Sequence, residues 1–180
     1  GLRPDTDRQV LLRLGEARVG EVDEVVEAIV VDRELGLQAL AVGHAAPEWL
    51  LLLSRIAASQ ALAVRDIPPD RARAPGGGPP LALDRLPRDP GWRRMLAVIL
   101  SAIPASGLPL EAADALRRLA HASPEELDRI AGAVLAGDVP QDQLACVPFV
   151  GAALQAWLAS LAAGIDPAGV APARGACPVC

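Results

Sequence analysis

Residues 144–165 read LACVPFVGAALQAWLASLAAGI, a run that contains no charged side chain. A helix needs about 20 apolar residues to cross a bilayer, so this length permits a membrane span. The run nevertheless fits lipid poorly, because polar or helix-disturbing residues lie inside it and acidic rather than basic residues flank it: Pro148, Gln155, Ser160, Asp142 and Asp166. A helix that is apolar on all sides is also what the centre of a helical bundle requires. The run therefore predicts a buried central helix and no membrane span.

The composition of the whole chain also favours helices. Of its 180 residues, 52% are hydrophobic but only 2% are aromatic, so the core must be built mainly from Leu, Ala, Val and Ile. Ala, Leu, Arg and Glu form helices well, and no stretch alternates apolar and polar residues as a strand does. The net charge is −5 without a basic stripe, so nucleic acid is not an expected partner. We expect an all-α multi-helix bundle.

Two segments carry clear helix-start signals. Asp89 can cap a helix whose first residue is Pro90, and one face of that helix is apolar at helical spacing: Trp92, Met95, Leu96, Ile99, Leu100 and Ile103. In the second segment, the Ser123 hydroxyl can accept from the Glu126 N–H while the Glu126 carboxylate reaches back to the Ser123 N–H. Gly137 is a plausible stop for that helix, whose buried stripe is Leu127, Ile130, Ala131, Val134 and Leu135.

Two more helices are expected from apolar spacing. The first runs over residues 47–64 and buries Trp49, Leu50, Leu53, Ile56 and Ala57. The second runs over residues 110–120 and presents Ala113, Leu116, Leu119 and Ala120. Trp49, Trp92 and Trp157 are interpreted as core anchors.

The chain divides into three parts. Residues 1–165 form the predicted helical domain, and the Pro/Gly-rich segment 67–80 is a linker or loop that offers a point of subdivision. Residues 166–176 are a Pro/Gly/Ala-rich exit linker, and residues 177–180 form a separate C-x-x-C motif. No charged segment followed by an apolar one opens the chain, so a cytoplasmic location is expected.

The sequence offers no support for an enzyme. His44 and His121 have no partner at metal or triad spacing, and the glycines at 76–78 lack the Lys-Ser/Thr of a phosphate loop. Cys146 lies in the apolar run and is interpreted as a small buried hydrophobe.

Cys177-Pro178-Val179-Cys180 is the motif with the most defined chemistry. This spacing places two thiolates on one tight loop, where they supply two of the four ligands of a tetrahedral metal site. A thioredoxin-like redox pair would need the first Cys to start a helix, and nothing follows the second Cys. In this chain the half-site is expected to be empty.

The order of several motifs resembles the formate dehydrogenase accessory protein family, FdhE. The resemblance rests on LPRDPGW at residues 86–92, on the helix 47–64 with Gln60 near its end, and on a C-terminal series of motifs: Pro148-Phe149, Ala152-Ala153-Leu154, Trp157 and the terminal Cys-Pro-Val-Cys. It covers nearly the whole chain. The family pattern continues beyond the first C-x-x-C with a glycine and further cysteine pairs, so this chain resembles its helical N-terminal region.

The resemblance implies a maturation factor rather than an enzyme. Family members join a helical region to a rubredoxin-like, zinc-ribbon segment that binds iron or zinc, and they assist the catalytic subunit of respiratory formate dehydrogenase before export. No cofactor is expected in this chain apart from the half-site of Cys177 and Cys180. A homo-oligomer is compatible with the sequence. One alternative is a generic helical interaction domain fused to a zinc ribbon with another client. The other is a membrane-associated protein that uses residues 144–165.

Arg88 and Asp89 are the candidate partner-binding residues. One hypothesis places them on a partner-binding groove. The other assigns Asp89 to helix capping and Arg88 to a surface ion pair.

Overall fold

The computed structural model describes residues 32–67 and 89–163, and within these ranges every regular element is a helix. Residues 32–41 are helical, and a short turn leads to α3 (Pro47–Asp66). The remaining elements are α4 (Pro90–Ala102), α5 (Leu110–His121), α6 (Pro124–Ala136), the 3-10 helix η2 (Gln141–Cys146) and α7 (Val147–Ala163). The all-α prediction is confirmed. The predicted exit linker, the terminal cysteine motif and most of the 67–80 segment lie outside the described residues.

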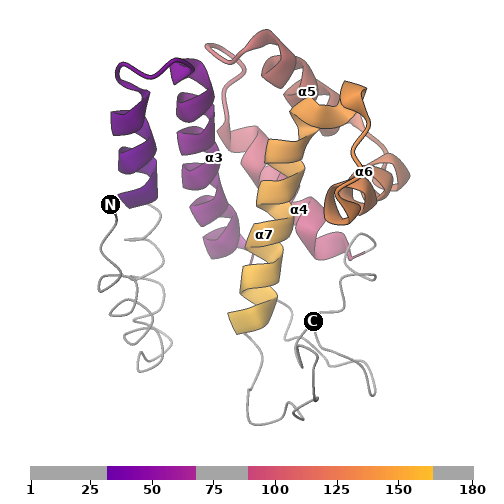
Figure 1. The fold of residues 1–180 in the computed structure, drawn as a ribbon. Coiled ribbons are helices and arrows are strands. Elements are labelled where there is room, and N and C mark those ends of the chain that lie inside the picture. The colour runs from indigo at the N-terminus through magenta and orange to yellow at the C-terminus, as the bar shows by residue number, and fades with distance from the viewer. Residues whose placement is uncertain (1–31, 68–88, 164–180) are drawn as a thin grey trace, which may run out of the picture.

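Three helices, α3, α4 and α7, form the centre of the domain (Figure 1). α4 packs against both α3 and α7, which also contact each other, while α6 packs on α7 and α5 on η2. α3 and α7 run in the same direction. Because α3 joins this core, residues on both sides of the segment 67–80 share one set of buried side chains.

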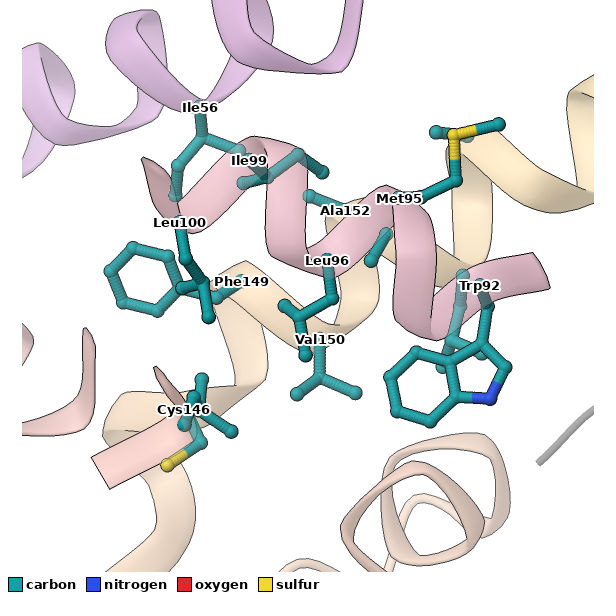
Figure 2. Close-up of a cluster of buried hydrophobic side chains, with 14 of the residues drawn as sticks. Ile56, Trp92, Met95, Leu96, Ile99, Leu100, Cys146, Phe149, Val150 and Ala152 are labelled. Atoms are coloured by element: carbon teal, nitrogen blue, oxygen red, sulfur yellow. The ribbon is translucent and has the colours of Figure 1, made fainter. Parts of the chain in front are cut away.

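The buried face of α4 is the one that the sequence predicts. All six residues of its apolar stripe are at most 8% exposed: Trp92, Met95, Leu96, Ile99, Leu100 and Ile103. Figure 2 shows most of this stripe against Phe149, Val150 and Ala152 of α7. The helix begins as expected, since Asp89 Oδ1 accepts a hydrogen bond from the Gly91 N–H at 2.7 Å and Pro90 occupies the first turn.

The uncharged run forms the predicted central helix with one difference at its start. Its first three residues belong to η2, and α7 then buries Phe149, Val150, Ala152, Ala153, Leu154, Ala156, Trp157 and Ser160. By length and composition alone, the helical run Gln141–Ala163 could also cross a membrane; in the folded chain, half of its most apolar window is buried by protein.

The start of α6 confirms half of the predicted capping box. The Ser123 Oγ accepts from the Glu126 N–H at 3.2 Å. The Glu126 carboxylate, in contrast, accepts from the Arg118 guanidinium of α5 at 3.2 Å, and a return bond to the Ser123 N–H is not among the bonds of the described residues. α6 ends at Gly137, whose φ of 70° is the left-handed conformation that favours glycine.

The predicted buried faces of α3 and α5 are partly wrong. Trp49 is 42% exposed and is not a core anchor, Leu50 and Leu53 are half-buried, and the buried residues of α3 are Leu52, Ser54, Ile56, Ala57, Ser59 and Ala63. Residues 50–53 are four consecutive leucines, so apolar spacing does not define which side faces the core. In α5 the buried residues are Ala112, Ala115 and Leu119, whereas Ala120 is exposed, because alanines occur on several sides of this helix.

Candidate functional site

Of the four predicted site residues, the structure describes only Asp89; Arg88, Cys177 and Cys180 lie outside the described residues. The Asp89 side chain is half-buried and caps α4. Its structural role is therefore shown, and its role in partner binding stays a prediction.

Cys146 and His44 are two further reactive side chains, and each takes part in the structure of the domain. Within residues 32–67 and 89–163, no group of three or more His, Cys, Asp or Glu side chains could hold a metal ion. The Cys146 thiol is buried, and burial raises its pKa because the thiolate would lose its hydration. His44 is exposed and accepts a hydrogen bond at Nδ1 from the Ala46 N–H at 3.0 Å, which fixes the turn before α3.

A groove opens where the helical residues 32–41 meet α3 and α7. Its volume is about 200 Å³. The lining is apolar apart from a guanidinium and two amides: Arg33, Leu37, Leu53, Ile56, Ala57, Gln60, Val147, Pro148, Gly151, Ala152 and Gln155. The sequence did not predict this groove, because its lining comes from helices that are distant along the chain.

Gln60 joins α3 to α7 at the edge of the groove. Its Nε2 donates to the backbone carbonyl of Ala152 at 2.9 Å and lies 3.4 Å from the Gln155 side-chain oxygen. Each donation uses the nitrogen of Gln60 and an oxygen of α7. The Gln60 carbonyl oxygen and the Gln155 amide nitrogen therefore stay available at the groove, one as an acceptor and the other as a donor.

Gly151 keeps the groove open. A Cβ atom built on Gly151 meets nothing within 4 Å, so the space above this residue belongs to the groove and not to the packed core. The sequence does contain one signal for the groove. Gly151 and Gln155 lie four residues apart, on one side of the uncharged helix α7, and neither of them is fully buried.

Gly91 has the opposite environment. A Cβ atom on Gly91 would lie 2.1 Å from Cζ2 of Trp157, so the first turn of α4 sits directly against the indole ring. This contact brings Gly91, a residue of the LPRDPGW motif, against Trp157, a second feature that was noted separately in the sequence.

Several large apolar side chains of the first helical stretch, the following turn and the start of α3 are exposed. Val42 is 86% exposed, and the others in this region are Leu35, Leu40 and Trp49. Exposed apolar side chains of this size are available for contact with a partner.

These features define an all-helical domain with an open groove of mixed apolar and amide character. A sequence model described as "FdhE, N-terminal" matches residues 31–174. The chain therefore belongs to the FdhE family.

Relatives with this name occur in several bacteria. The chain is 36% identical over 160 residues to a protein named "Protein FdhE homolog" from Rhizobium meliloti, covering 83% of this chain and 52% of the relative. It is 32% identical over 158 residues to a homolog from Erwinia tasmaniensis, covering 82% of this chain and 52% of that protein. A Salmonella paratyphi B protein named "Protein FdhE" is 36% identical over 108 residues, 58% of this chain and 34% of the relative. The chain thus spans about half the length of the first two relatives, and no solved structure matches it.

Proposed function

We propose that this chain is the helical part of an accessory factor that binds the catalytic subunit of a formate dehydrogenase and assists its assembly before export. The observation that carries the proposal is the family match, which extends over residues 31–174 and therefore over most of the helical domain. Such a factor acts through protein contact and not by catalysis, and it works in the cytoplasm because export follows assembly.

The structure is compatible with a binding role. The groove at Gly151 and the exposed apolar side chains beside the turn at residues 42–46 provide surface on which an incompletely folded partner could bury apolar area. The acidic net charge of −5 helps to keep a protein with exposed apolar side chains soluble.

The metal site belongs to the same proposal. Cys177 and Cys180 have the spacing of one metal knuckle, and in the natural full-length protein we expect further thiolates to complete a site for iron or zinc. Metal analysis of that protein should show bound metal that is lost on Cys177→Ser and Cys180→Ser substitution.

The test is a binding experiment with the natural full-length protein immobilised. The immature catalytic subunit of formate dehydrogenase, produced without its metal cofactor, should be retained. The mature holoenzyme and an unrelated exported metalloenzyme should be recovered only at background level. Failure to retain the immature subunit would contradict the proposed function.

A further inference from the structure

We infer that the groove between residues 32–41, α3 and α7 binds one segment of the client polypeptide, with an apolar side chain on the groove floor and a carboxylate beside Arg33. This inference rests on the proposed function and assigns a docking site to it.

The size of the groove suits a side chain rather than a metabolite. Sites for small organic ligands usually measure about 300–1,000 Å³, whereas this groove measures about 200 Å³. Its floor is formed by Leu53, Ile56 and Ala57 of α3 together with Ala152 of α7. Burial of one large apolar side chain against this floor would contribute about 1.5–3 kcal/mol before the costs of association.

The two amides at the edge match a peptide backbone. Gln60 uses its Nε2 group to hold the Ala152 carbonyl, so its own oxygen is left as an acceptor, and the neighbouring Gln155 retains its NH₂ donors. In an extended segment, the N–H and C=O of one residue point to the same side, whereas those of one peptide unit point in opposite directions. The free oxygen of Gln60 can accept from the N–H of one client residue while the NH₂ group of Gln155 donates to the C=O of the same residue.

The charge at the groove selects an acidic segment. Arg33 is the one charged residue of the lining, its side chain is exposed, and no residue in the described ranges forms an ion pair with it. A guanidinium beside an apolar floor favours a carboxylate, which it can bind through two parallel hydrogen bonds. We therefore assign the site to an apolar segment that carries Asp, Glu or a chain-terminal carboxylate.

Gly151 allows a test that fills the groove without disturbing the core. Since a Cβ at Gly151 meets nothing within 4 Å, the Gly151→Leu side chain should project into the groove. Gly132→Leu in α6 is the matched control. Gly132 is also a helical glycine with nothing within 4 Å of an added Cβ, and it does not line the groove. Arg33→Glu and Arg129→Glu form a second pair, since Arg129 is an exposed arginine of α6 outside the groove.

The experiment measures the affinity of the natural full-length protein and these variants for the immature catalytic subunit by biolayer interferometry. Gly151→Leu and Arg33→Glu should each weaken binding by about tenfold or more, and the two controls should stay within about twofold of wild type. Circular dichroism should show that all variants are folded; if Gly151→Leu is not, the surface pair Arg33→Glu and Arg129→Glu decides.

Three results would overturn the inference. Wild-type affinity in the folded Gly151→Leu or Arg33→Glu variant would exclude the groove as a client site while leaving the proposed function intact. A wild-type dimer that Gly151→Leu converts to a monomer, measured by light scattering, would assign the groove to a second copy of this chain. Absence of client binding by the wild type itself would contradict the proposed function and the inference together.

Discussion

Substitution of Gly91 by alanine should destabilise the domain, although alanine is the better helix former. The added Cβ would lie 2.1, 2.2 and 2.5 Å from Cζ2, Cε2 and Cη2 of Trp157. Carbon atoms in contact prefer about 3.5 Å, so the ring or the first turn of α4 would have to move by roughly 1.4 Å. Neither moves easily, because Trp157 is 2% exposed and Asp89 caps the turn.

The expected size of the effect follows from two opposing terms. Extra atoms in a packed core cost about 1–3 kcal/mol, and the upper value applies because the obstacle is a rigid ring and not the end of a flexible side chain. Replacing glycine by alanine within a helix contributes about 0.5–1 kcal/mol in the other direction. We expect Gly91→Ala to lose about 2 kcal/mol, which lowers the Tm by about 4–8 °C for a chain of this size.

Thermal and urea unfolding followed by circular dichroism would measure this loss. Gly132→Ala is the control: its added Cβ has open space, so it should be as stable as wild type or gain up to about 1 kcal/mol. A double-mutant cycle with Trp157→Leu isolates the contact, since Gly91→Ala should cost much less once the indole ring is absent. Equal stability of Gly91→Ala and Gly132→Ala would refute the close packing of α4 on Trp157.

Three further predictions concern caps and the buried thiol. Asp89→Ala should lower the free energy of unfolding by about 0.5–2 kcal/mol, whereas Asp89→Asn keeps the cap and should leave stability unchanged. A loss of client binding in Asp89→Asn would therefore reveal a separate role of the Asp89 charge in partner contact. Ser123→Ala should cost about 1 kcal/mol in urea unfolding through the lost bond to the Glu126 N–H. Because burial raises the pKa of Cys146 above its ordinary value of 9.0, the stability contributed by this thiol is present below pH 9 and is lost as the pH rises through the higher native pKa. Peptide mapping after iodoacetamide treatment at pH 8 should find Cys146 modified only in denaturant.

Helix α4 could be predicted almost completely from the sequence. Its stripe has a single phase, since Arg93 and Arg94 break the apolar pattern on the other side and Asp89-Pro90 defines the start. Local chemistry therefore determined both the boundary and the buried face. The Ser123 cap and the Gly137 stop of α6 were predictable for the same reason, as each depends on residues within one turn.

Helix α3 and the groove could not be predicted in this way. Four consecutive leucines at 50–53 are equally apolar on every side, and only contacts with α4 and α7 decide that Leu52 is buried while Leu51 is 40% exposed. The groove depends on a missing side chain at Gly151 and on a bond from Gln60 to a carbonyl 92 positions along the chain. The spacing of Gly151 and Gln155 marks one side of α7, but it does not indicate which helix lies across the groove. Of the candidate site residues, only Asp89 could be placed, and its cap was predictable because it acts within its own turn.

Small residues allow the uncharged helix α7 to pack closely at the centre of the domain. Ala152, Ala153 and Ala156 are at most 7% exposed, and their short side chains let α3 and α4 approach the helix axis closely. On the exposed side of α7, the Gln155 side-chain oxygen accepts a hydrogen bond from the Gln60 amide of α3. Gly151 lies on the same side of the helix. This side of α7 forms the edge of the groove, and its other sides pack against α3, α4 and α6, where an uncharged surface is required.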